Sequence, residues 1–264
     1  MNYAELIEYI NDSKISKKGR NERLQSFRFS NDPTKATVFA DSLCNKVWPS
    51  KEDLTLAEEK YKLAIQLADK NGNNEILDIA RSHLGNMYYK QKNFDKALIY
   101  LQSSPSVEDV LKCAEICKMS NNHDGVYSYY NVAEKKHCHD ALLKAYEYAR
   151  LQKDFDRMRE YCSKYIKLDP SIASIKKKQN LANEIKTLFY LALRDSKNTD
   201  HERIKKLKQQ ESDFDQLLRN EGLTIIKEPL IGKLNDGQVV TQVSSSIIVV
   251  ALLAIAKKMI KRDW

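Results

Sequence analysis

The stretch "LGNMYYKQKNFDKALIYL" (residues 84–101) predicts two short helices joined by a tight turn. Small and apolar residues recur at helical spacing in both halves, and the polar pair "KN" at 92–93 separates them. The residues that carry this spacing are Leu84, Gly85, Tyr88, Ala97 and Leu101, with Phe94 at the turn. We therefore expect a helical hairpin to be the unit of this fold.

Turn-forming residues are scarce along the whole chain. The 264 residues include 7 Gly and 5 Pro, whereas charged residues make up 30% of the sequence. A sandwich or barrel needs many tight turns that are rich in Gly, Pro and Asn. The composition therefore predicts an all-α protein with long helices and short connections.

The hairpin pattern recurs through residues 51–170 at unequal intervals. Equivalent positions at Ala57, Ala97, Val126 and Met158 lie 40, 29 and 32 residues apart. The pattern resembles the tetratricopeptide repeat, a helix pair of about 34 residues in which a small residue lets two helices approach. This resemblance implies an α-solenoid, a right-handed superhelix of antiparallel helix pairs. Helical hairpins of unrelated ancestry would give the same intervals.

The breaks between predicted helices and the outer segments complete this organisation. Breaks are expected at 71–74, 92–93, 103–106 and 120–123. The predicted segments are N-terminal helices with a basic loop (1–50), repeats (51–170), a capping hairpin (171–222), a linker (223–236), a hydrophobic helix (237–256) and a basic tail (257–264). In the first segment, Ser13–Ser26 is expected to be a loop because it lacks apolar periodicity, and Lys35–Trp48 is expected to be a helix that packs ahead of Ala57.

No motif in the sequence predicts catalysis, a metal site or a cofactor. The cluster "HCHD" (137–140) contains metal-ligating residue types, but neighbouring residues on a helix point about 100° apart and cannot converge on one ion. We expect it to be a polar loop between two repeats. Cys113, Cys117 and Cys162 fall where the repeat needs small or medium apolar residues, so they are expected to be packing residues.

Charge and cysteine content indicate a cytosolic surface and no nucleic-acid partner. The net charge of +8 comes from 44 basic and 36 acidic residues, which alternate along the predicted helices as solvated faces usually do. No basic stripe with interleaved aromatic residues predicts nucleic-acid binding, and no small-molecule substrate is indicated. The five cysteines are odd in number, and the first ten residues include Glu5 and Glu8 instead of the apolar core of a secretory signal.

The resemblance also implies a protein partner. Repeats of this kind bind a peptide or helix in a groove lined by the first helix of each unit. We expect the candidate groove residues to be Asn86, Tyr89, Lys112 and Tyr129. One subclass clamps the terminal carboxylate of heat-shock chaperones through five polar positions, of which this sequence matches two, so that subclass is disfavoured.

The C-terminal segment is a candidate membrane anchor. Residues 237–256 contain no charge and would span about 30 Å as a helix, which is the thickness of a bilayer core. The strongly apolar positions are Ile247, Ile248, Val249, Val250, Leu252, Leu253 and Ile255, and the basic flank is Lys257, Lys258, Lys261 and Arg262. This layout is similar to tail anchors of the mitochondrial outer membrane. A helix buried against protein and a helix lying on the membrane surface are the alternatives.

The sequence therefore predicts a non-enzymatic adaptor that faces the cytosol and recruits a partner to an organelle membrane, with the mitochondrial outer membrane favoured. The alternative is a soluble cytoplasmic scaffold, similar to vesicle-fusion attachment proteins or to a subunit of a larger complex. In that case the apolar tail would dock on protein.

Overall fold

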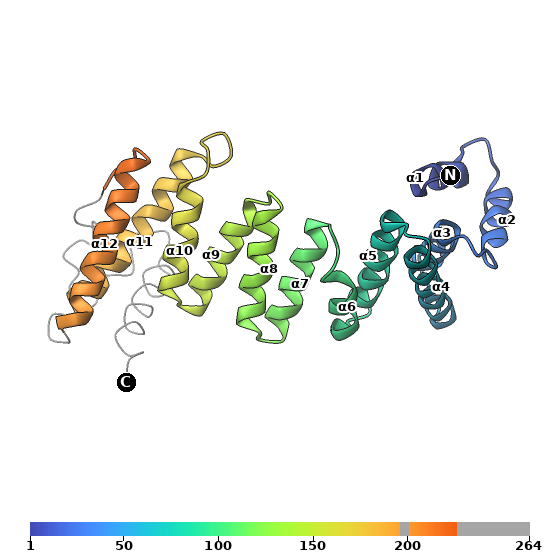
Figure 1. Ribbon diagram of the computed structural model, residues 1–264, viewed down its shortest axis with the longest axis horizontal. Coiled ribbons are helices and arrows are strands. Elements are labelled where there is room, and N and C mark those ends of the chain that lie inside the picture. The colour runs from blue at the N-terminus through green and yellow to red at the C-terminus, as the bar shows by residue number, and fades with distance from the viewer. Residues whose placement is uncertain (196–200, 226–264) are drawn as a thin grey trace. The chain divides into compact units, whose positions relative to one another are not determined.

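The structure is a computed structural model that describes residues 1–195 and 201–225. This part of the chain forms twelve α-helices and no strand, and consecutive helices pack as pairs (Figure 1). The helices are α1 (Tyr3–Asn11), α2 (Lys17–Phe27), α3 (Pro33–Cys44), α4 (Lys51–Lys70), α5 (Asn74–Lys90), α6 (Phe94–Leu101), α7 (Val107–Met119), α8 (His123–Lys135), α9 (Asp140–Gln152), α10 (Phe155–Ile166), α11 (Ile175–Asp195) and α12 (His201–Asn220). The predicted all-α class is confirmed.

The chain divides into two compact units, and each is described by itself. The N-terminal unit comprises residues 1–132 and the C-terminal unit begins at residue 133. In the N-terminal unit, α3 packs against α4, α4 against α5, and α5 against α6. In the C-terminal unit, α9 packs against α10, and α11 packs against both α10 and α12.

The polar breaks predicted from the sequence are the helix connections of the structure. Ser50 starts α4 with a reciprocal cap, because its Oγ accepts a hydrogen bond from the Asp53 N–H while the Asp53 carboxylate accepts one from the Ser50 N–H, both at 3.1 Å. Asn73 caps α5 in a related way through the Ile76 N–H at 3.2 Å. Left-handed backbone follows α4 at Gly72 and α5 at Lys92, so each helix stops where the sequence turns polar.

Gly85 lets the two helices of the quoted hairpin approach closely. A Cβ atom at this position would lie 2.6 Å from Cδ2 of Leu101 and 3.2 Å from Cβ of Tyr100, both on α6. Real Cβ atoms do not approach other carbon atoms so closely, and only glycine fits here without a shift. The predicted role of the small residue in the hairpin is therefore confirmed.

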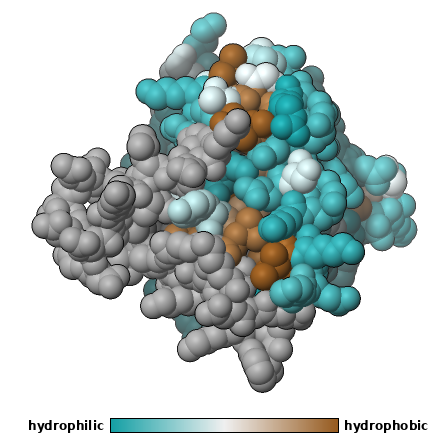
Figure 2. Space-filling model, turned by 90° about the vertical axis from the view of Figure 1, so that its left-hand side faces the viewer, coloured by the Kyte–Doolittle hydropathy of each residue, from teal (hydrophilic) through white to brown (hydrophobic). Residues whose placement is uncertain are grey.

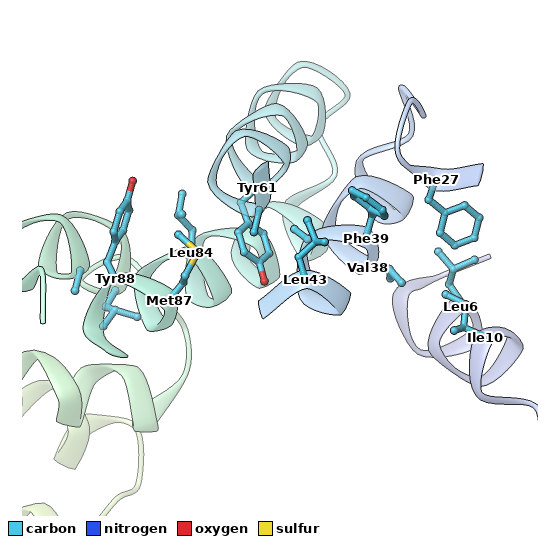
Figure 3. Packing of buried hydrophobic residues seen from close by; sticks show 14 of the residues in the cluster. Leu6, Ile10, Phe27, Val38, Phe39, Leu43, Tyr61, Leu84, Met87 and Tyr88 are labelled. Carbon is cyan, nitrogen blue, oxygen red and sulfur yellow. The ribbon is translucent and has the colours of Figure 1, made fainter. Parts of the chain in front are cut away.

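The core of the N-terminal unit extends from its first helix to α7. Figure 3 shows one end and the middle of this cluster, with Leu6, Ile10, Phe27, Val38, Phe39, Leu43, Tyr61, Leu84, Met87 and Tyr88. Each of these side chains is buried, and together they belong to the first five helices. The helices before residue 51 are therefore part of the same core as the helices that follow.

Two local predictions in the N-terminal unit are wrong. Residues 17–26, expected to be part of a loop, belong to α2, which is capped by Ser16 at its first turn and buries only Phe27. The Ser16 cap and the burial of Phe27 stabilise this helix without the apolar stripe that the sequence prediction required. The helix expected over Lys35–Trp48 ends at Cys44, which leaves Val47 and Trp48 in the connection to α4. Both side chains are exposed.

The core of the C-terminal unit is built around three aromatic rings. The rings of Phe155 on α10 and Phe189 on α11 meet edge to face with their centroids 5.0 Å apart. Phe189 also lies 6.2 Å from the ring of Phe214 on α12. Both helices of the predicted terminal hairpin are thus present and in contact. In Figure 2, the described surface of this end is mostly hydrophilic, with smaller hydrophobic patches between polar side chains.

The predicted anchor at 237–256 and the basic tail at 257–264 lie outside the described residues. Over residues 1–195 and 201–225, no helix has the length and apolarity needed to cross a bilayer. The membrane anchor therefore stays a prediction.

Candidate functional site

The first helices of three consecutive pairs, α3, α5 and α7, are joined directly by polar side chains. The hydrogen bonds run from α3 to α5 and from α5 to α7. We call this surface the polar face, and its members are Asp41, Ser82, His83, Asn86, Tyr89, Asp109, Lys112 and Glu115. It lies within the N-terminal unit.

Asp41 is the centre of one half of the polar face. Its carboxylate is buried and accepts hydrogen bonds from the hydroxyls of Tyr3 and Tyr61, each at 2.5 Å. His83 Nδ1 lies 2.7 Å from the same carboxylate. Buried carboxylates are costly unless several donors compensate for the lost water, and Asp41 has three. One side chain thereby connects α1, α3, α4 and α5.

The environment of His83 favours the protonated imidazole. Burial by itself would lower the pKa of His83, but the hydrogen bond that the ring donates to Asp41 and the charge of that carboxylate outweigh it and raise the pKa above its ordinary value. The ring is held edge to face against Tyr3 and Tyr61, with centroid distances of 5.8 and 6.3 Å. A protonated His83 would balance the buried charge of Asp41.

The second half of the polar face is a network around Asp109. This buried carboxylate accepts hydrogen bonds from Ser82 at 2.5 Å, Ser104 at 2.7 Å and Asn86 at 3.0 Å. The Lys112 ammonium donates to the side-chain oxygen of Asn86 at 2.6 Å. The network links α5 to α7 and to the connection that precedes α7.

A pocket of about 380 Å³ opens beside Asp41. Its lining combines buried and half-buried apolar residues with polar residues at the mouth. The lining residues are Tyr3, Asp41, Cys44, Asn45, Pro49, Leu54, Tyr61, His83, Asn86, Met87, Lys90 and Gln91. Among the described residues, the side chains of Asn45, Lys90 and Gln91 make no hydrogen bond or ion pair with the protein. The mouth of the pocket therefore carries donors that the fold does not use.

Three of the four predicted groove residues lie on the polar face. Asn86 and Lys112 contact each other, and the Tyr89 hydroxyl donates to Glu115 at 2.7 Å. Tyr129 lies elsewhere, because α8 is the second helix of its pair, and its half-buried ring packs against the core. The structure brings Asn86, Tyr89 and Lys112 together on two adjacent helices, and their role in binding a partner stays a prediction.

Asp41, His83 and Lys90 were not predicted as site residues from the sequence. Asp41 is the only acidic residue within α3, and its position between the apolar residues Ala40 and Leu43 was the available signal. His83 and Lys90 had no comparable signal, because polar residues at such spacing usually form a solvated face. Their proximity to Asp41 depends on the packing of α3 against α5.

The three cysteines predicted to be packing residues are buried. Burial raises the pKa of Cys113 to about 12 and also raises the pKa values of Cys117 and Cys162. A raised pKa keeps each thiol in its neutral, unreactive form. The "HCHD" cluster connects α8 to α9. No group of three metal-ligating side chains occurs in the described part of the chain.

No protein-family model, curated protein or solved structure matches this chain. The chemistry of the site is therefore inferred from its own residues. It offers a pocket with an apolar wall, unused amide groups and one unused ammonium group. Such a set can bind a ligand through hydrogen bonds and charge.

Proposed function

We propose that this protein is a non-enzymatic adaptor of the tetratricopeptide-repeat type, which binds a segment of a partner protein on the polar face. The observation that carries the proposal is the direct side-chain connection of α3, α5 and α7, the first helices of three consecutive pairs. In helical-repeat proteins, the first helices of successive pairs form the surface that holds partner peptides or helices.

The distribution of hydrogen bonds favours binding over catalysis. Asp41 and Asp109 each accept three hydrogen bonds from side chains of the protein, so both carboxylates hold helices together. The groups that have no partner in the described chain, Asn45, Lys90 and Gln91, lie at the pocket mouth. Carboxylates that hold the helices together, next to side chains with unused donors, suit the recognition of a peptide.

We further propose that the C-terminal segment anchors the adaptor in an organelle membrane, with the mitochondrial outer membrane favoured. The support is in the sequence, where twenty uncharged residues at 237–256 precede four basic residues. Only about half of those twenty residues are strongly apolar, a length also typical of a buried helix. The alternative is therefore a soluble scaffold whose tail docks on protein.

The binding proposal is tested by photo-cross-linking in cells. A benzoylphenylalanine residue at Gln91 would lie at the pocket mouth, whereas one at Glu59 would lie on an exposed position of α4. Glu59 precedes the inward-facing Tyr61 by two residues and so points about 200° away from it. We expect protein adducts from the Gln91 position alone. Adducts of equal yield from both positions, or from neither, would rule out binding on this face.

The membrane proposal is tested by carbonate extraction of membranes from cells that express the chain with and without the residues after Asp236. We expect the full chain to stay in the membrane fraction and the truncated chain to be released. If both are released equally, the anchor is rejected and the soluble scaffold is favoured.

A further inference from the structure

We propose that the pocket beside Asp41 binds an internal peptide segment in which an Asp or Glu adjoins an apolar residue. The apolar side chain contacts Leu54 and Met87, and the carboxylate pairs with Lys90. The inference rests on the proposed adaptor function and names the chemistry of its partner.

The charges that line the pocket favour an anionic ligand. Asp41, His83 and Lys90 are the lining residues with side chains that carry charge. Asp41 and His83 contact each other at 2.7 Å and form a pair. Lys46, in the adjoining connection, is paired with Asp53 at 2.6 Å. Lys90 is therefore the charge that the site leaves without a partner, and it favours an anionic ligand.

Lys90 lines the same pocket as Cys44 and His83, and its positive charge acts to lower the pKa of both groups. A lysine in the last helical turn also compensates for the helix dipole, and Lys90 does so in α5. Lys70 occupies the same position in α4, is exposed and does not line the pocket, so it serves as a matched control.

The apolar wall requires a second ligand group next to the anion. Met87 is buried and Leu54 and Pro49 are half-buried, and all three line the pocket. Val47 and Trp48 precede Pro49 and are 85% and 89% exposed. Tryptophan is enriched at the energetic centres of protein interfaces, and Trp48 adjoins the pocket-lining residue Pro49 in the chain. A free phosphate or a nucleotide would leave this wall unused and would normally need more than one cation.

The two unused amides indicate that a peptide backbone passes through the site. Asn45 follows the end of α3 and Gln91 follows the end of α5, so they lie at the ends of two different helices. Each side-chain amide can both donate to and accept from a peptide group. With one amide at the end of each helix, the chain can be held on both sides of the acidic residue, so we assign the carboxylate to a side chain and not to a C-terminus.

The test is the selection of ten-residue peptides from a random library that displays them internally, without a free C-terminus. The full chain, its Lys90→Glu variant and its Lys70→Glu variant are each used for selection. We expect the native chain and the Lys70→Glu variant to enrich Asp or Glu next to Leu, Ile, Met or Phe. The Lys90→Glu variant should enrich Lys or Arg at the acidic position instead.

Affinities of the selected peptides are then measured by tryptophan fluorescence. The chain contains two tryptophans, so Trp264→Phe leaves Trp48 as the reporter beside the pocket. We expect Lys90→Glu to weaken binding of acidic peptides about tenfold or more, since it replaces an attraction with a repulsion. Lys70→Glu should change the affinity less than twofold. A free-acid peptide with Gln in place of the acidic residue should not bind, which separates a side-chain carboxylate from a terminal one.

Selection without an acidic preference, selection unchanged by Lys90→Glu, or no selected peptide at all would overturn this inference. If binding is lost in Lys112→Glu but kept in Lys90→Glu, the adaptor function survives and the pocket assignment fails. The cross-linking comparison of Gln91 with Glu59 decides the adaptor function separately.

Discussion

The N-terminal unit buries a carboxylate and the C-terminal unit buries an ammonium, and the two charges have different kinds of partner. Asp41 is held by two neutral tyrosine hydroxyls and by His83. Lys186 on α11 forms ion pairs with Glu211 and Asp215, both on α12. Asp41 thereby joins four helices, whereas Lys186 joins the two helices of one hairpin.

The two buried charges differ in how exposed their partners are, and this exposure decides how much stability each unit loses when the charge is removed. The partners of Lys186 are about one quarter exposed, and although Asp215 Oδ1 is itself buried, water reaches part of both carboxylates when the lysine is absent. The Tyr61 hydroxyl is buried beside Asp41 and has no such compensation. The N-terminal unit should therefore respond more strongly, and over more helices, to the loss of Asp41 than the C-terminal unit to the loss of Lys186.

We expect the largest effect from Asp41→Ala. Removal of one partner from a buried, hydrogen-bonded charge cluster costs about 3–5 kcal/mol. Hydrogen exchange measured by mass spectrometry should accelerate in α1, α3, α4 and α5 together. If the acceleration is confined to α3, Asp41 does not connect these four helices.

Lys186→Met should have a smaller and more local effect. The loss of hydrogen bonds to a charged group costs about 1.5–3 kcal/mol, and the methionine still fills the space. Exchange should accelerate in α11 and α12 while α3 to α5 keep their native rates. A loss of stability equal to that of Asp41→Ala would contradict the comparison.

Gly85→Ala tests whether close backbone approach also limits the N-terminal unit. Overpacking against Leu101 costs about 1–3 kcal/mol, and the better helix propensity of alanine offsets about 1 kcal/mol. We expect a net loss of up to about 2 kcal/mol in urea denaturation of the full chain. In a Leu101→Ala background the added methyl group has room, so the same change should cost nothing or stabilise. An equal cost in both backgrounds would show that Leu101 is not the obstacle.

The smallest expected effect is a pH dependence of the N-terminal unit. Because the pKa of His83 is raised in the folded state, its protonation stabilises the fold fully below the unfolded value of about 6.5. This contribution is lost as pH rises through the higher folded pKa. The charges that act on the imidazole are Asp41 and Asp109, which raise its pKa, and Lys90, which lowers it.

The measurement is hydrogen exchange of α3 and α5 at pH 6 and pH 8, corrected for the intrinsic exchange rates. Protection should be lower at pH 8 in the native chain. His83→Gln keeps a hydrogen-bond donor near Asp41 but does not titrate, so the difference should disappear. A difference that persists in this variant would assign the effect to another group.

Much of the fold follows from local patterns in the sequence. The helix breaks and the small residue at position 85 were predicted because caps, turns and close helix contacts need particular residue types. The terminal hairpin was predicted from apolar periodicity in 180–195 and 203–220. Helix α2 was missed because it depends on the Ser16 cap and one buried residue, Phe27.

The sequence by itself determined the all-α class, the hairpin as the unit and the burial of Cys113, Cys117 and Cys162, since each depends on residue type and short-range spacing. Only the tertiary structure decided that Asp41, Tyr3, Tyr61 and His83 meet, because these residues are 20 to 42 positions from Asp41 along the chain. The same packing of α3 on α5 placed Lys90 at the mouth of a pocket. Spacing along one helix predicts which face is buried, but the packing of the helices determines which residues share a pocket.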